Sequence, residues 1–225
     1  MNDPLPPCQL HVDAIPQTGQ RNMQLDGEML QQVVDDESTS IVRIYRWDQP
    51  TVSLGYFQKH DEHTDPRLQQ CDRVHRVTGG GAILHDDELT YSCAVPAVHP
   101  IRSHPTELYC DVHSAIVSVL HTCGATCAMR KDTAPSAVDP NADEPFLCFL
   151  RADPRDVVLQ GHKILGSAQR RRKGAILQHG SILLRHSTLT PEIPGIIDLC
   201  PDFDVVQFTE LLPKAVARAV ANDIC

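Results

Sequence analysis

Hydrophobic residues recur at helical spacing in three parts of the chain. In residues 22–36 the apolar positions lie three or four residues apart, which places them on one face of a helix. Residues 105–123 repeat this pattern, and Pro105 lies near the start, where a helix tolerates proline. Residues 205–221 predict a closing helix.

Short apolar runs predict strands between the first two helices. Residues 48–50, Asp-Gln-Pro, form a turn between two of these runs. Three consecutive glycines, at positions 79–81, interrupt another run, which then resumes. The predicted strands span residues 40–47, 51–54, 73–78, 82–85 and 88–95.

A second group of strands follows the middle helix. Residues 156–160 and 163–168 flank Gly161 and His162, and glycine at the first central position suits a type II′ hairpin turn. A third strand is expected over residues 175–184. Hairpins that alternate with a few helices predict an α+β fold, with a mostly antiparallel sheet flanked by helices.

The length of 225 residues is that of one large domain. Residues 1–20 are rich in Pro and Gln and show no periodicity, so we expect an extended N-terminal lead-in. Residues 21–225 are expected to form a single domain. Within it, residues 131–145 predict a long polar loop, and such loops are often functional.

The charge balance excludes one class of function. Lys and Arg number 20 against 29 Asp and Glu, a formal net charge of −9, whereas a dedicated nucleic-acid binder has a strong basic excess. No apolar run reaches the roughly 18 residues of a membrane span. The N-terminal residues lack the basic and apolar segments of a secretory signal, so we expect a cytoplasmic protein.

Nine cysteines in a chain without an export signal argue against a disulfide framework. Most are expected to be small buried hydrophobic residues. Cys123 and Cys127 do not have a standard zinc spacing, although His113 and His121 nearby leave a metal site as the alternative. We favour the structural interpretation and expect no metal. The open question is whether one cysteine is a nucleophile.

The glycine run is the first candidate for chemistry. Gly79, Gly80 and Gly81 allow a close backbone approach and expose N–H donors to an anion or a carbonyl group. Arg76 could add a bidentate contact. The alternative is a glycine-rich bulge in a sheet.

A lysine inside an apolar hairpin strand is the second candidate. Lys163 could stabilise a developing oxyanion or hold a carboxylate or phosphate, unless it lies on the solvent face of an edge strand. Residues 170–173 form a basic cluster that is either a solvated turn or a docking site for an acidic partner. His179 and Ser181 share one face of the next strand, where His179 has either a core role or a direct substrate contact.

Taken together, these segments resemble the signature blocks of the lipoate-protein ligase and octanoyltransferase family. The resemblance implies the α+β scaffold of biotin protein ligases and class II tRNA synthetase cores, with residues 21–225 as one lipoyl or octanoyl transferase catalytic domain. Residues 78–82 favour the lipoyl branch, because a biotin ligase has an Arg-rich glycine loop. The matching blocks, in family order, are residues 22–26, 53–58, 76–86, 161–170 and 177–184.

Two chemistries occur in this family. Ligases use ATP and Mg²⁺ to activate free lipoate as an acyl-adenylate, whereas transferases move an octanoyl or lipoyl group from a carrier thioester onto a cysteine. Both then acylate a lysine of a lipoyl domain. Transfer from a thioester to a thiol is nearly isoenergetic, so a cysteine intermediate needs no ATP and no other cofactor.

Cys148 is the expected nucleophile. Residues 146–149 resemble the cysteine block of one octanoyltransferase branch, and in that resemblance Lys163 is the partner of Cys148. A nearby ammonium lowers a thiol's pKa and can stabilise a tetrahedral intermediate. The alternative is a buried structural cysteine. Residues 151–156 differ from the stretch that usually follows the cysteine in that branch.

The resemblance also implies the remaining site residues and partners. The acyl chain would lie in an aliphatic tunnel, with its carbonyl end near Lys163 and the glycine run. Lipoyl-domain proteins, such as the glycine cleavage H protein or a 2-oxoacid dehydrogenase E2, are the expected acceptors, with acyl carrier protein as a donor; neither nucleic acid nor a membrane is expected. The expected substrate-binding residues are Arg76, Gly79, Gly80, Gly81, His85, Ser167, Ala168, Gln169, His179 and Gly180.

We therefore expect an acyltransferase of lipoate metabolism. The first alternative is an ATP-dependent lipoate-protein ligase, although the chain ends near residue 225 without the C-terminal accessory domain of many ligases. The second alternative is an inactive paralogue that only binds lipoyl domains.

Overall fold

A computed structural model describes residues 5–59, 65–133 and 145–224 of the chain, and the loop predicted over 131–145 lies largely outside these ranges. Its main sheet is antiparallel except for the parallel pair β1–β2. An α+β fold with a mostly antiparallel sheet is thereby confirmed. In spatial order the strands are β1 (Cys8–Val12), β2 (Ser40–Tyr45), β6 (Glu88–Val95), β10 (Ala175–Leu183), β9 (His162–Arg172), β8 (Val157–Leu159) and β7 (Ala128–Met129).

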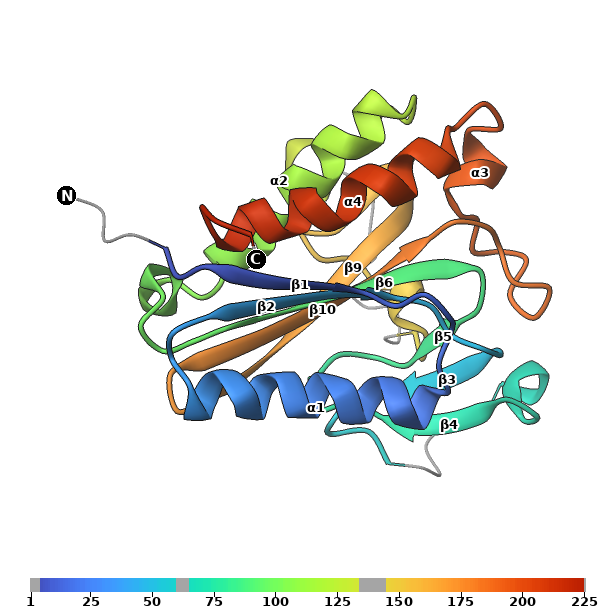
Figure 1. The fold of residues 1–225 in the computed structure, drawn as a ribbon. Coiled ribbons are helices and arrows are strands. Elements are labelled where there is room, and N and C mark those ends of the chain that lie inside the picture. The colour runs from blue at the N-terminus through green and yellow to red at the C-terminus, as the bar shows by residue number, and fades with distance from the viewer. Residues whose placement is uncertain (1–4, 60–64, 134–144, 225) are drawn as a thin grey trace.

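Helices cover both faces of this sheet (Figure 1). α2 (Glu107–Thr122) and α4 (Val205–Val220) lie side by side on one face, and the short α3 (Ile196–Leu199) precedes α4. The largest apolar cluster fills the space between these helices and the sheet. α1 (Gly19–Asp35) covers the opposite face, where Met29, Leu30 and Val33 pack against the strands.

A second, smaller sheet lies on the α1 side of the molecule (Figure 1). It consists of β4 (Asp72–His75), β3 (Thr51–Leu54) and β5 (Ile83–His85), with β3 in the centre. The glycine run at 79–81 connects β4 to β5. Thr78, directly before this run, is hydrogen-bonded to His179 of β10, the central strand of the main sheet.

The hydrophobic pattern predicted most elements to within a few residues, but it did not predict two features. The segment expected as a lead-in contributes β1, which pairs in parallel with β2. The hairpin between β8 and β9 has Gln160 and Gly161 as its central residues, with φ angles of 51° and 85°. Two positive φ angles define a type I′ turn, so the predicted type II′ turn with Gly161 in first place is wrong.

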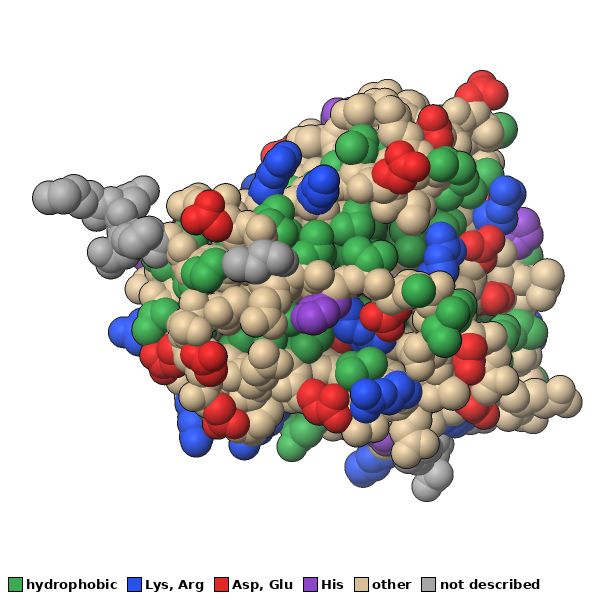
Figure 2. All heavy atoms as spheres, viewed as in Figure 1, with side chains coloured by type: hydrophobic (Ala, Val, Ile, Leu, Met, Phe, Trp, Pro, Cys, Tyr) green, Lys and Arg blue, Asp and Glu red, His purple; other side chains and the backbone are tan. Residues whose placement is uncertain are grey.

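On the face drawn in Figure 2, acidic and basic side chains are interspersed, so neither sign of charge dominates it. Hydrophobic side chains gather near the middle of that face. None of the helices in the described ranges has the length and apolar content of a membrane span.

Candidate active site

Backbone hydrogen bonds join the Cys148 segment to Ala82, the residue that follows the glycine run. Cys148 begins a single 3₁₀ turn, Cys148–Leu150, and its backbone N–H donates to the Ala82 carbonyl oxygen at 2.7 Å. The Ala82 N–H in turn donates to the Phe146 carbonyl oxygen at 3.1 Å. These two bonds fix the half-buried thiol beside Gly80 and Gly81.

Lys163 points toward this thiol. Its Nζ lies 3.7 Å from Cys148 Sγ and 3.3 Å from the Cys148 carbonyl oxygen. Only 4% of the Lys163 side chain is exposed, so it does not lie on the solvent face of an edge strand. Gly166 makes room for it, because a Cβ at that position would lie 2.8 Å from Nζ.

Asp156 compensates the buried ammonium. Its Oδ1 lies 2.9 Å from Lys163 Nζ, and its Oδ2 accepts a 2.8 Å hydrogen bond from the Asp153 N–H. Burial raises the pKa of this carboxyl group, and the neighbouring ammonium opposes that rise. Asp156 was not among the site residues expected from the sequence. The available signal was an acidic residue at the start of the strand that pairs with the Lys163 strand.

Arg76 supports the glycine loop from inside the protein. Its guanidinium donates to the carbonyl oxygens of Gly79 at 3.1 Å and Gly81 at 2.8 Å, and to the Ser53 backbone and hydroxyl oxygens at 2.7 Å each. Burial lowers the Arg76 pKa to about 10, which leaves the group charged at neutral pH. These bonds hold the loop and place a second positive charge beneath it.

Two buried histidines connect the loop to the scaffold. His85 stacks on Trp47 with 3.8 Å between ring centroids, and it is hydrogen-bonded to Ser53 and Glu88 at 2.6 and 2.8 Å. Burial lowers the His85 pKa, so the ring is neutral at pH 7. His179 is hydrogen-bonded to Asp26 of α1 at 2.7 Å and to the Thr78 hydroxyl at 2.6 Å. Asp26 was not expected as a site residue either, although it lies on the buried stripe of α1.

Cys148 lies where two cavities meet. The first cavity, called here the apolar cavity, has a volume of about 40 Å³ and is walled mainly by apolar side chains and glycines. The second, called here the polar cavity, has a volume of about 210 Å³ and contains Lys163 and Asp156. Both cavities share Gly80, Cys148 and Ser167. The apolar cavity also includes Met23, Tyr45, Trp47, Arg76, Gly79, Ile83, His85, Thr90, Phe149, Gly166, Ala168, His179, Gly180 and Ser181.

Most expected site residues are thus brought together, but Gln169 is not. Its amide donates to Gln178 and to the Pro105 carbonyl oxygen, both at 2.8 Å, and it lines neither cavity. The histidines considered as metal ligands also have other partners. His113 is hydrogen-bonded to Ser167 and to the Arg155 carbonyl oxygen, and His121 to the Cys127 carbonyl oxygen.

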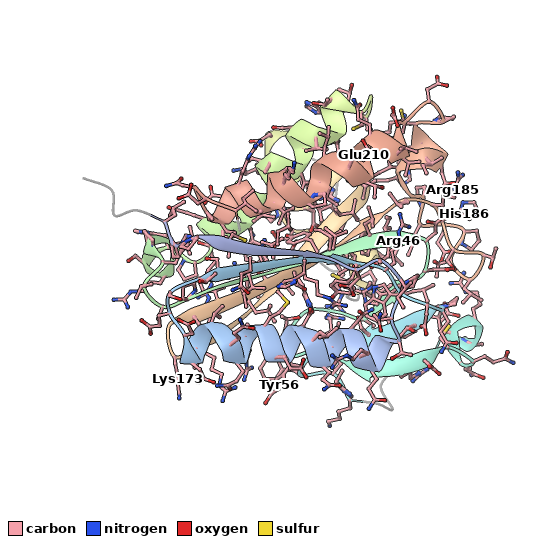
Figure 3. The ribbon with its side chains drawn as sticks, viewed as in Figure 1. Arg46, Tyr56, Lys173, Arg185, His186 and Glu210 are labelled. Carbon is pink, nitrogen blue, oxygen red and sulfur yellow. The ribbon has the colours of Figure 1, made fainter. Side chains whose placement is uncertain are left out.

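The basic cluster at 170–173 covers the end of β9 and the first residue of the turn to β10. The Arg170 guanidinium lies over the Tyr56 ring, 4.6 Å from its centroid. The Tyr56 N–H donates to the Thr78 carbonyl oxygen at 2.8 Å, so this pair adjoins the glycine loop. Figure 3 shows Tyr56 and Lys173 on the side of the molecule that carries α1.

Solved structures share this fold. The structure of protein Ta0514 from T. acidophilum with bound lipoic acid has a TM-score of 0.71 at 20% identity, over 98% of this chain and 88% of that one. Lipoate-protein ligase A bound with ATP has a TM-score of 0.68 at 21% identity, over 98% and 89% of the two chains. At these identities the likeness establishes the scaffold alone.

Sequence relatives and a family model identify the family as well as the scaffold. Octanoyltransferase LipM of Carboxydothermus hydrogenoformans is 31% identical over 92% of this chain and 72% of its own length. Octanoyltransferase LipM of Oceanobacillus iheyensis is 38% identical over 77% of this chain, which spans 63% of that relative. The model of the lipoyl protein ligase A/B catalytic domain matches residues 18–192. Since that match covers most of the sequence, the chain belongs to the lipoyl protein ligase A/B catalytic-domain family.

Proposed function

We propose that this chain is an acyltransferase of lipoate metabolism. It moves an octanoyl or lipoyl group from a carrier thioester to Cys148, and from Cys148 to a lysine of a lipoyl domain. The observation that carries the proposal is the position of Cys148 Sγ, 3.7 Å from the buried Lys163 ammonium and at the junction of two cavities. The octanoyltransferase names of the sequence relatives support the same reaction.

In the first half-reaction the Cys148 sulfur attacks the carbonyl carbon of the donor thioester. A new C–S bond forms, the old C–S bond breaks, and the carrier leaves as a thiol with the proton that Cys148 gives up. In this proposal the Lys163 ammonium, 3.7 Å from the sulfur, compensates negative charge on the sulfur, and N–H groups of the glycine loop, which lines the polar cavity, compensate charge on the carbonyl oxygen. The ion pair with Asp156 holds Lys163 in this position.

The two cavities divide the substrates by polarity. The acyl chain enters the apolar cavity, whose volume of about 40 Å³ must increase when the chain binds. Met23, a flexible side chain in its wall, is suited to move for this purpose. The carrier arm, and afterwards the acceptor lysine, enter through the polar cavity. The basic cluster beside the glycine loop is placed to meet an acidic carrier or lipoyl domain.

One experiment tests this function directly. The chain is mixed with an octanoylated acyl carrier protein and a lipoyl domain, such as an H protein or an E2 domain, with and without ATP and Mg²⁺. The proposal predicts octanoylation of the lipoyl domain in both samples. Modification that requires free octanoate or lipoate together with ATP would instead identify a ligase, and binding of the lipoyl domain without modification would identify an inactive paralogue.

A further inference from the structure

His113 is a buried residue of the site that the proposed chemistry does not use. It lies on α2, is 1% exposed and lines the polar cavity with Cys148 and Lys163. Its Nδ1 lies 2.6 Å from the Arg155 carbonyl oxygen, and its Nε2 lies 2.6 Å from Ser167 Oγ. A carbonyl oxygen only accepts, so Nδ1 carries a hydrogen. Burial lowers the pKa of His113 to about 4, so the ring is neutral and Nε2 accepts from Ser167.

This arrangement fixes the direction of a longer hydrogen-bond chain. Since the Ser167 hydroxyl donates to His113, the Tyr91 hydroxyl donates to Ser167 over 2.7 Å. The Gln178 amide donates to the Tyr91 oxygen over 2.9 Å. Tyr91 and Gln178 are both fully buried, so water does not compete for these bonds.

This series of hydrogen bonds orients the Ser167 hydroxyl oxygen as a hydrogen-bond acceptor. Its only hydrogen is used toward His113 and one lone pair receives the Tyr91 hydrogen, which leaves one lone pair. Ser167 lines both cavities beside Cys148. Gly180, on the neighbouring strand, leaves room for the hydroxyl, because a Cβ there would collide with Ser167 Oγ.

We propose that Ser167 binds the attacking amine of the acceptor lysine through this remaining lone pair, and that His113 and Tyr91 are positioning residues that hold it. The inference rests on the proposed function. The amine nitrogen attacks the carbonyl carbon of the Cys148 thioester, a C–N bond forms and the C–S bond breaks. Cys148 leaves as a thiolate and receives the proton that the amine nitrogen loses.

The contribution of Ser167 is confined to one half-reaction. An attacking amine has N–H groups that can donate to Ser167, whereas a donor thioester has no N–H at its reacting carbon. Loss of the Ser167 hydroxyl therefore slows the transfer of the acyl group from Cys148 to the lysine more than it slows the acylation of Cys148 by the thioester. A merely structural role would slow both steps together.

Single-turnover kinetics separate the two steps. Octanoylated carrier protein is used to measure acylation of Cys148, and the isolated acyl-enzyme is then mixed with a lipoyl domain. In Ser167→Ala and His113→Asn we expect aminolysis to slow by about tenfold more than acylation does, as for the loss of one hydrogen bond. Because a glutamine amide oxygen can occupy the position of Nε2, the acyl-enzyme of His113→Gln should react with the acceptor lysine faster than that of His113→Asn.

Two results would overturn the inference: unchanged aminolysis in Ser167→Ala, or an equal slowing of both half-reactions in all three variants. Failure of the wild-type chain to form any acyl-enzyme would overturn the proposed function itself. That outcome is distinguishable, because it precedes the step that Ser167 serves. Acyl-enzyme formation by each variant also reports that its site is folded.

Discussion

Lys163 Nζ lies between the Cys148 sulfur, at 3.7 Å, and the Asp156 carboxylate, at 2.9 Å. Both partners of the ion pair are almost fully buried, with 4% and 5% of their side chains exposed. A charge in such a position needs its counterion, because neither water nor salt screens it. Asp156 therefore affects both the chemistry and the stability of the site.

Asp156→Asn should impair both properties. The variant leaves the Lys163 ammonium uncompensated, so we expect the free energy of unfolding to fall by about 3 kcal/mol and Cys148 acylation to slow by roughly 100-fold. Urea unfolding and rapid-quench acylation measure the two effects. Asp153→Asn is the matched control, since its ion pair with Arg155 is partly exposed and is worth at most about 1 kcal/mol. Equal behaviour of the two variants would contradict the role of Asp156.

Gly166→Ala tests the space around the lysine. An added Cβ would lie 2.8 Å from Lys163 Nζ, so the ammonium must leave its present position beside Cys148 and Asp156. We expect acylation of Cys148 to slow by about tenfold or more. Gly27→Ala is the control: apart from its chain neighbours and the backbone of its own helix, no atom lies within 4 Å of its added Cβ, and alanine in helix α1 should stabilise the protein by about 0.5–1 kcal/mol. Full acylation by the Gly166 variant would show that the lysine position is unimportant.

The neutral state of His113 predicts a pH dependence of stability. Its pKa is about 4 in the folded protein and about 6.5 in the unfolded chain, so the unfolded state binds more protons between these values. Stability from this group is present above pH 6.5 and is lost as the pH falls toward 4. Between pH 7 and pH 5 the wild type should lose roughly 2 kcal/mol more than His113→Gln. Parallel pH profiles in urea unfolding would refute this prediction.

Filling the apolar cavity should change the accepted acyl length. Ala168 lines this cavity, and Ala168→Leu adds methyl groups where the acyl chain is expected to lie. We expect octanoyl transfer to weaken by about tenfold, while butyryl transfer is retained. Competition between the two acyl carriers gives the ratio of kcat/KM directly. An unchanged ratio would place the acyl chain elsewhere.

The hydrophobic pattern was sufficient for the main elements because α1, α2 and α4 each bury one regular stripe. It was insufficient for β1, a short edge strand without alternation, and for the turn at Gln160, where a non-glycine residue adopts a positive φ angle.

The candidate site was predictable where residues are linked by motif, as Cys148, Lys163 and the glycine run are. The contacts of His113 and Asp26 join elements that are distant in sequence, which no local pattern encodes. Asp156 pairs with Lys163 across the adjacent β8–β9 hairpin, so its signal was local. His113 and Asp26 did leave a signal: each is a polar residue at a buried position on a mostly apolar helical stripe. A buried polar residue requires a partner, and here the partners belong to the site.

The mass of the intact protein after incubation with octanoylated acyl carrier protein tests the central claim most directly. We predict one octanoyl group on the wild-type chain, labile to neutral hydroxylamine, and none on Cys148→Ala. Cys110→Ala is the matched control, because Lys131 Nζ also lies 3.7 Å from Cys110 Sγ but that pair lines neither cavity. An octanoyl adduct that persists in Cys148→Ala, or that disappears in Cys110→Ala, would contradict the account.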